Sequence, residues 1–129
     1  MDKLKNKVAI ITGASSGIGR ATAYALASEG CDLVITARRE ERLKEVKETC
    51  EKEGVRVVYY TGDVRLEKTA KETVDLAVST FGKVDILINN AGIGKLISLE
   101  DSTADDYREI MDTNVFSSFY FLNMLWLTC

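Results

Sequence analysis

The residues best suited to chemistry begin with a glycine-rich segment, Thr12 to Gly19, in which the glycines are spaced G-x-x-x-G-x-G. The segment lies between an apolar run and an amphipathic run, which predicts a turn from a strand into a helix. Gly13 permits a tight turn, Gly17 leaves room for a ligand to approach the backbone, and Gly19 permits close helix packing. The spacing differs from the common G-x-G-x-x-G fingerprint, but it meets the same physical requirements.

Backbone amides that open a helix bind anions, so this turn suits the diphosphate of a dinucleotide. Hydroxyl groups in the turn add further hydrogen-bond donors. A glycine-rich turn that binds no ligand is the alternative. The residues predicted to contact the diphosphate are Gly13, Ser15, Ser16, Gly17, Ile18 and Gly19.

Two arginines, Arg38 and Arg39, follow the apolar run Leu33–Ile35. An NAD site places an Asp or Glu at about this distance beyond the glycine turn, where it binds the ribose hydroxyls. A carboxylate would repel the 2′-phosphate of NADP, whereas guanidinium groups bind that phosphate bidentately. The sequence therefore favours NADP(H) over NAD, with Arg38 as the main phosphate ligand and Arg39 as its helper. A solvated pair of charges at a helix start is the alternative.

Composition excludes several other chemistries. Histidine is absent, which rules out histidine metal ligands and general bases, and we expect no metal site. Cys31, Cys50 and Cys129 are widely spaced without a CxxC pair, which favours idle thiols in a reducing compartment. The formal net charge of −3 argues against nucleic acid as a partner. Val115–Cys129 is apolar but too short to span a membrane, so we expect a cytoplasmic protein.

These residues must be positioned by strands that alternate with helices. Apolar and β-branched runs predict four strands, at Val8–Ile11, Leu33–Ile35, Val57–Tyr60 and Val84–Ile88. Amphipathic segments predict helices after the glycine turn, over Glu40–Glu53, over Leu66–Phe81 and from Ala104 onward. The first three are expected to end at Gly30, Gly54 and Gly82. This pattern predicts one α/β domain over residues 1–129, with a doubly wound, Rossmann-type parallel sheet and right-handed crossovers.

Helical spacing also predicts the faces of these helices. For the first helix the predicted face comprises Ile18, Ala21, Thr22, Ala25 and Leu26. For the second it is a narrow stripe of Leu43, Val46 and Cys50. For the third it comprises Ala70, Val74, Ala77, Val78 and Phe81.

At this point the sequence resembles the classical short-chain dehydrogenase/reductase family, over residues 7 to about 122. Its TGxxxGxG cofactor turn corresponds to Thr12–Gly19, and its NNAG motif corresponds to Asn89–Gly92. Gly62-Asp63-Val64 is similar to the family's adenine contact, and Asn114 matches the helix asparagine of its catalytic set. Some NADP-using members carry a basic residue before the second glycine, where this chain has Ser16.

The resemblance implies roles for these residues. Asp63, with the Val64 backbone beside it, would accept a hydrogen bond from the adenine amino group; an Asx-turn is the alternative. Asn90, Ala91 and Gly92 would lie under the ribose, although a polar turn satisfying backbone groups is also compatible. Asn114 would order a water in a proton relay, which makes it the one catalytic candidate; otherwise it is bonded only locally.

The family's acid/base unit is a tyrosine followed four residues later by lysine, with a serine upstream. The five tyrosines here, at positions 24, 59, 60, 107 and 120, are followed at that distance by Ser28, Asp63, Val64, Met111 and Met124. We therefore expect the N-terminal portion of such an enzyme, truncated after the fourth strand and the following helix and unable to turn over. The fourth strand would then be an open edge of the sheet, and the aromatic tail would lack the residues that usually cover it. The last segment, Asn123–Cys129, departs from the family's pattern.

The function expected is hydride transfer between NADP(H) and a small-molecule alcohol or carbonyl, by a homo-oligomer when intact. A non-catalytic dinucleotide-binding or interaction module is the alternative.

Overall fold

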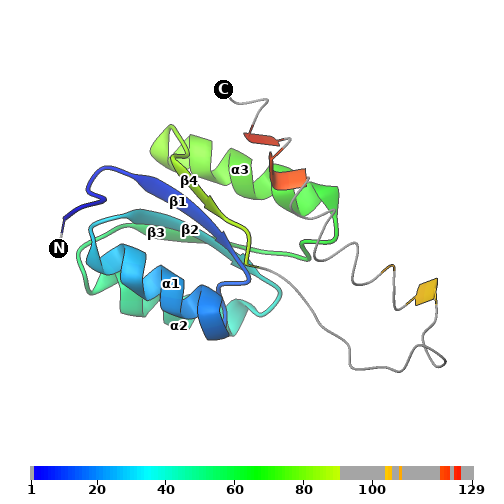
Figure 1. Cartoon of the computed structure of the whole chain (residues 1–129), viewed down its shortest axis with the longest axis horizontal. Coiled ribbons are helices and arrows are strands. Elements are labelled where there is room, and N and C mark those ends of the chain that lie inside the picture. The colour runs from blue at the N-terminus through cyan, green and yellow to red at the C-terminus, as the bar shows by residue number, and fades with distance from the viewer. Residues whose placement is uncertain (1, 91–103, 106–107, 109–119, 123, 126–129) are drawn as a thin grey trace.

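The computed structural model describes residues 2–90, 104, 105, 108, 120–122, 124 and 125 of the chain. The strands are β1 (Val8–Thr12), β2 (Asp32–Ala37), β3 (Val57–Thr61) and β4 (Ile86–Ile88). They alternate with the helices α1 (Gly17–Ser28), α2 (Glu40–Glu51) and α3 (Glu67–Phe81). The strands form a parallel sheet in the order β3-β2-β1-β4 (Figure 1). The predicted α/β class and doubly wound arrangement are confirmed.

Helices cover both faces of this sheet, with α1 and α2 on one face and α3 on the other (Figure 1). Strands β1 and β2 are almost wholly buried, because adjacent residues point into different layers. Ile10 pairs with Val34 and belongs to the layer under α3, whereas Ile11 pairs with Ile35 and belongs to the layer under α1 and α2. This two-sided burial explains the continuous apolar runs of these strands.

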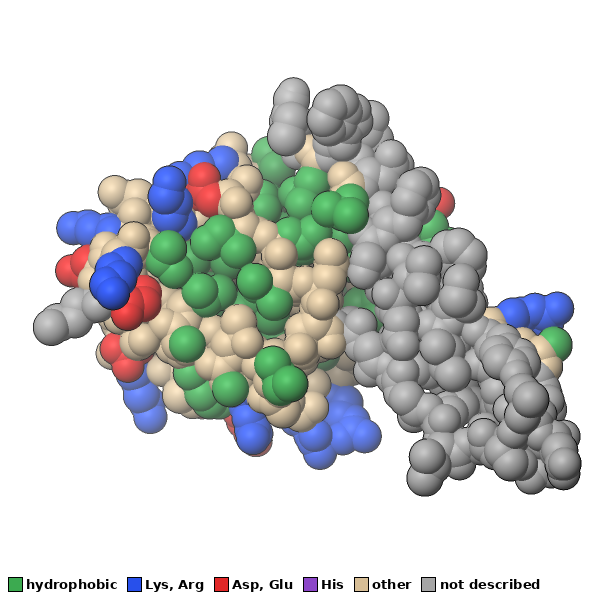
Figure 2. All heavy atoms as spheres, viewed as in Figure 1, with side chains coloured by type: hydrophobic (Ala, Val, Ile, Leu, Met, Phe, Trp, Pro, Cys, Tyr) green, Lys and Arg blue, Asp and Glu red, His purple; other side chains and the backbone are tan. Residues whose placement is uncertain are grey.

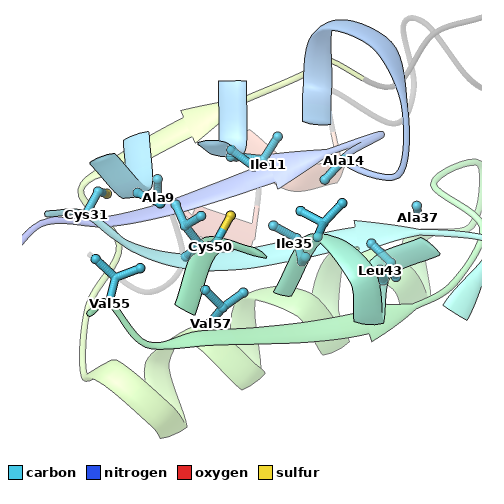
Figure 3. Close-up of a cluster of buried hydrophobic side chains, with 14 residues drawn as sticks. Ala9, Ile11, Ala14, Cys31, Ile35, Ala37, Leu43, Cys50, Val55 and Val57 are labelled. Atoms are coloured by element: carbon cyan, nitrogen blue, oxygen red, sulfur yellow. The ribbon is translucent and has the colours of Figure 1, made fainter. Parts of the chain in front are cut away.

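The first hydrophobic cluster lies between the sheet and helices α1 and α2 (Figure 3). The predicted stripe of α2 is confirmed, since Leu43, Val46 and Cys50 are buried there. Cys31 and Cys50 are both buried free thiols, and burial raises the pKa of each to about 11. The prediction of idle thiols holds for these two cysteines, and Cys129 lies outside the described residues.

The second hydrophobic cluster lies between the sheet and α3. Phe121 is fully buried in it, and Tyr120, Met124 and Leu125 pack against it partly buried. The expectation that the aromatic tail lacks cover is therefore wrong for Phe121. Phe121 belongs to the cluster that α3 forms with β1 and β2, which also includes the small residues Ala70 and Ala77.

The buried face of α1 differs from the predicted one. Gly19, Ala23 and Ala27 are buried, whereas Ile18 is 76% exposed and Ala21 and Ala25 are also exposed. Residues four apart lie on one side of a helix, so the buried set is a regular stripe of the smallest side chains. Close approach of α1 to the sheet selects side chains by size, which hydrophobic periodicity does not detect.

On α3 the buried face is shifted in a similar way. Ala70, Val74 and Ala77 are buried as predicted, but Val78 is exposed and Thr73 is buried. The Thr73 hydroxyl donates to the Thr69 carbonyl at 2.7 Å, which satisfies its polar group inside the core.

Helix ends agree well with expectation. Gly30, Gly54 and Gly82 have φ values of 88°, 87° and 81°, the left-handed conformation that ends helices. The strands extend one to three residues beyond the predicted bounds, except that β4 begins at Ile86. In the predicted fourth helix, residues 104, 105 and 108 are helical and the positions between them lie outside the described residues.

Hydrophobic side chains gather in the middle of one face, with charged side chains around them (Figure 2). Partly buried residues at the border of the first cluster include Tyr24 and Leu26 of α1 and Ile86 and Ile88 of β4.

Strand β4 pairs only with β1 in the part of the chain that the structure describes, as expected for an open edge. Among those residues no helix is long and apolar enough to cross a membrane, and no group of metal-ligating side chains occurs.

Candidate functional site at the carboxyl edge of the sheet

The glycine turn leaves β1 at the carboxyl edge of the sheet and is hydrogen-bonded to the end of β4. The Asn90 amide N–H donates to Thr12 Oγ1 at 3.0 Å, and the Asn90 side-chain amide donates to the Gly13 carbonyl at 3.3 Å. Thr12 Oγ1 donates in turn to the Ile88 carbonyl at 3.5 Å. Asn90 thus satisfies backbone groups of the turn, as the polar-turn interpretation predicts. The hydrogen bonds of the Thr12 hydroxyl were not predicted from the sequence, although Thr12 belongs to the motif.

On its other side the turn is bonded to the end of β2. The Ala14 amide N–H donates to the Thr36 carbonyl at 3.3 Å, and Ala14 is fully buried. Thr36 is itself fixed, because its hydroxyl donates to the Tyr60 carbonyl at 2.7 Å. The ends of all four strands are therefore connected through the turn and its neighbours, which places the turn beside the residues that follow β2.

Two of the three glycines of the turn, Gly17 and Gly19, meet different constraints. A Cβ atom on Gly19 would lie 2.1 Å from the Gly13 carbonyl oxygen and 2.5 Å from Asn90 Nδ2, so no other residue fits there. Gly17 has a φ of 56°, and a Cβ built on it would meet nothing within 4 Å. Gly19 thus permits the close approach of α1 to the turn, whereas the backbone at Gly17 opens onto free space.

The N-terminus of α1 is not capped by a side chain. Ser16 is the N-cap residue, its backbone is extended, and its hydroxyl makes no capping hydrogen bond. No acidic residue lies in the first turn of the helix. The uncapped amides and the open space at Gly17 together fit an anionic diphosphate, because both the partial positive charge and the room for close approach are present.

Arg38 and Arg39 follow the end of β2, as predicted. The Arg38 side chain is 67% exposed, and its guanidinium lies 3.8 Å from the Asp63 carboxylate. Arg39 is the N-cap residue of α2 and lines a shallow surface depression of about 520 Å³ together with Glu40, Glu41 and Arg42. Asp32 stands at the opposite end of β2, where it pairs with Arg56 at 3.1 Å. Asp32 is therefore not at the position expected for an NAD-binding acidic residue, and the residue directly after β2 is Arg38.

Asp63 follows β3 at the same edge of the sheet, and its carboxylate is bound by Arg65. The Arg65 amide N–H donates to Oδ1 at 2.9 Å, which forms the Asx-turn that was the alternative interpretation. The Arg65 side chain donates to both carboxylate oxygens, the shortest contact being 2.7 Å to Oδ2. Hydrogen bonding to Arg65 holds the pKa of Asp63 below its usual range, with a smaller contribution from Arg38.

Arg65 is a residue that sequence reasoning missed. Its position two residues after an aspartate is a weak signal, because the same spacing is common on solvated surfaces. Val64, between the two, is buried in the second cluster. Of the remaining candidates, Asn90 is described above, whereas Ala91, Gly92 and Asn114 lie outside the described residues.

The strand order, the crossover helices and the glycine turn at the carboxyl edge define a Rossmann-type fold. The chain belongs to the short chain dehydrogenase family, whose model matches residues 7–126. This match extends past Leu122, so the expectation that the family resemblance stops there is wrong for residues 123–126. Met124 and Leu125 pack against the second cluster, which gives the extension a structural basis.

General stress protein 39 of Bacillus subtilis is 44% identical over 121 residues, which cover 92% of this chain and 42% of that protein. L-sorbose reductase from Gluconobacter frateurii, solved with NADPH and L-sorbose, has a TM-score of 0.94 and 35% identity. That match covers 99% of this chain and 49% of the reductase. An NAD⁺-bound xylitol dehydrogenase has a TM-score of 0.91 and 35% identity, covering 98% of this chain and 49% of the dehydrogenase. The chain thus spans less than half the length of these relatives.

Proposed function

We propose that this chain forms the NADP(H)-binding part of an oxidoreductase that transfers hydride between NADP(H) and a small-molecule alcohol or carbonyl. The observation that carries the cofactor choice is the exposed Arg38 guanidinium at the end of β2. The turn is bonded to Thr36, so a diphosphate on the turn would bring the adenosine ribose toward the residues after β2. A guanidinium there attracts a 2′-phosphate, and Asp32 lies too far along the strand to oppose it.

The residues of the chain would divide the work of binding. Gly13, Ser15, Ser16, Gly17, Ile18 and Gly19 would hold the diphosphate; Arg38 and Arg39 would hold the 2′-phosphate; Asp63 and Val64 would contact the adenine; and Asn90, Ala91 and Gly92 would lie under the ribose. The bound nicotinamide would supply the hydride chemistry. Asn114 is proposed to order a water that serves proton transfer. Assembly as a homo-oligomer in the cytoplasm completes the proposal.

The solved relatives leave the choice of dinucleotide open. The sorbose reductase was solved with NADPH, whereas the xylitol dehydrogenase was solved with NAD⁺. Both have about the same identity to this chain, so overall similarity does not discriminate between the cofactors. The side chains that follow β2 are therefore the basis for choosing NADP(H) here.

The binding proposal is tested by titrating the 129-residue chain with NADPH and NADH in a calorimeter. We expect tighter binding of NADPH, and we expect Arg38→Met to weaken NADPH by about tenfold with little effect on NADH, since it removes a charge-assisted contact to the phosphate alone. Arg42→Met is the matched control, because Arg42 is an exposed arginine in the first turn of the neighbouring helix. Equal affinity for the two dinucleotides would contradict the NADP(H) assignment.

A second candidate function is dinucleotide binding without turnover. It is favoured by the sequence, in which no tyrosine is followed four residues later by lysine. A phenol in that setting is what would exchange the proton while hydride moves. Incubating the chain with NADPH and a panel of aldehydes and ketones separates the two functions. Binding without oxidation of NADPH supports the second candidate for these 129 residues, and measurable turnover contradicts it.

A further inference from the structure

The Asp63 carboxylate lies between two guanidinium groups that hold it very differently. Arg65 donates from its backbone amide to Oδ1, from Nε to both oxygens at 3.1 Å, and from a terminal nitrogen to Oδ2 at 2.7 Å. Arg38 approaches Oδ2 at 3.8 Å, which is beyond hydrogen-bond distance. Arg65 therefore binds Asp63 tightly, and Arg38 only borders it.

The exposure of the three side chains follows the same order. Asp63 is 23% exposed and Arg65 is 34% exposed, whereas Arg38 is 67% exposed. The Asp63–Arg65 pair is thus partly removed from water, where charge–charge attraction is stronger, and the Arg38 head remains in solvent. A carboxylate has about four acceptor positions, and the donors of Arg65 occupy most of them. Little acceptor capacity is left to draw Arg38 into a direct contact.

On the basis of the NADP(H) assignment above, we infer that Arg65 is a positioning residue that determines dinucleotide specificity. By binding Asp63, it keeps the Arg38 guanidinium available for the 2′-phosphate and cancels an anionic charge that would repel that phosphate. Without Arg65, the carboxylate would pair with Arg38, and no uncommitted guanidinium would remain for the 2′-phosphate. Such a site loses its preference for NADPH over NADH.

The test is a comparison of dissociation constants for NADPH and NADH between the unmodified chain and Arg65→Met. We expect the preference for NADPH to fall by about tenfold, the size of losing one charge-assisted contact. Lys68→Met is the matched control, because Lys68 is an exposed cation in the first turn of α3 and its replacement removes the same charge. The control should keep the preference.

Adding Asp63→Asn to Arg65→Met should restore most of the preference, because the competing charge is then gone. The adenine is common to both dinucleotides, so any loss of an adenine contact cancels in the ratio of their affinities. This rescue separates a specific electrostatic role from general structural damage. Asp63→Asn alone, which does not depend on the folding of the Arg65 variant, should leave the preference equal or greater.

Three outcomes would each overturn the role of Arg65. The first is an unchanged preference for NADPH in Arg65→Met, and the second is a double variant whose preference stays as low as that of Arg65→Met. The third is a reduced preference in Asp63→Asn. These results leave the proposed function standing when the unmodified chain itself prefers NADPH. Failure of the unmodified chain to bind either dinucleotide, or a preference for NADH, would overturn both proposals.

Discussion

The two ends of the parallel sheet differ in how their polar groups are used. At the amino end, the Asp85 carboxylate accepts from the Val8 amide at 2.9 Å and pairs with Lys83 at 3.0 Å. Asp32 there accepts from both the backbone and the side chain of Arg56. At the carboxyl end, the N-terminus of α1 has no side-chain cap and the Arg38 head is in solvent. The amino end uses its charges to join segments, whereas the carboxyl end keeps donors available for a ligand.

This division implies that substitutions at the amino end change the free energy of unfolding but do not change the affinity of the folded protein for NADPH. Substitutions of exposed groups at the carboxyl end, such as Arg38, should do the reverse. Gly19 and the hydrogen bonds of Asn90 are the exception, because they form a rigid base beneath the proposed ligand. The following three predictions test this comparison, its exception at Gly19 and the burial of the two core thiols.

The largest effect is expected for Gly19→Ala. The new methyl group would lie 2.1 Å from the Gly13 carbonyl oxygen, and backbone has to move to relieve the overlap. We expect the free energy of unfolding to fall by about 3 kcal/mol, together with loss of NADPH binding. Denaturant unfolding and calorimetry measure the two effects. Gly17→Ala is the control, with room for the methyl group but a positive φ, and should cost about 1 kcal/mol. Equal stability of the two variants would contradict the steric explanation.

A smaller effect is expected for Asp85→Ala at the amino end. The Val8 amide would lose its acceptor and Lys83 would lose its ion pair, although it keeps its hydrogen bond to the Asn6 carbonyl, so the free energy of unfolding should fall by about 1 kcal/mol. The affinity of the folded chain for NADPH should stay within about twofold of the original, a change of under half a kcal/mol. Asp75→Ala, which removes an exposed pair with Lys71 on α3, should change neither quantity. A marked loss of affinity in Asp85→Ala would break the division between the two ends.

The smallest effect at neutral pH concerns the buried thiols Cys31 and Cys50. Their pKa values rise from 9.0 to about 11 on folding, because burial disfavours the thiolate. The raised pKa means that the unfolded chain releases these protons first. The contribution of the two thiols to stability is therefore constant below about pH 9 and decreases as the pH rises toward 11. In a Cys129→Ser background, alkylation by a maleimide at pH 7.5 should be slow until denaturant is added. Rapid modification of the native chain would contradict the burial of these groups.

Much of this fold is predictable because its strongest determinants are local. Short β-branched runs predicted the strands. Gly54 and Gly82 predicted helix ends, because the left-handed conformation needed there depends on the local backbone and not on distant parts of the chain. The face of α1 was not predictable from periodicity. Ala23 and Ala27 are buried for their small size, and Ile18 is exposed although it is the most apolar residue of the segment.

The candidate site divides in the same way. The glycine turn and Arg38 were recognisable because their positions after β1 and β2 fix them at one edge of the sheet. The partners of Asp63 were not, because nothing in the chain order states that Arg65 turns back onto the carboxylate or that Arg38 reaches toward it from the segment after β2. Side-chain direction of this kind is settled only by the folded geometry.

The open space around Gly17, combined with its φ of 56°, has a consequence for stereochemistry. Room is available for a Cβ atom of the natural configuration there, so the constraint on this residue in the absence of a ligand is one of handedness rather than volume. Amino acids of the mirror-image configuration prefer positive φ, as those of the natural configuration prefer negative φ. The φ of 56° at this position therefore suits a D-alanine introduced by chemical synthesis better than its natural enantiomer.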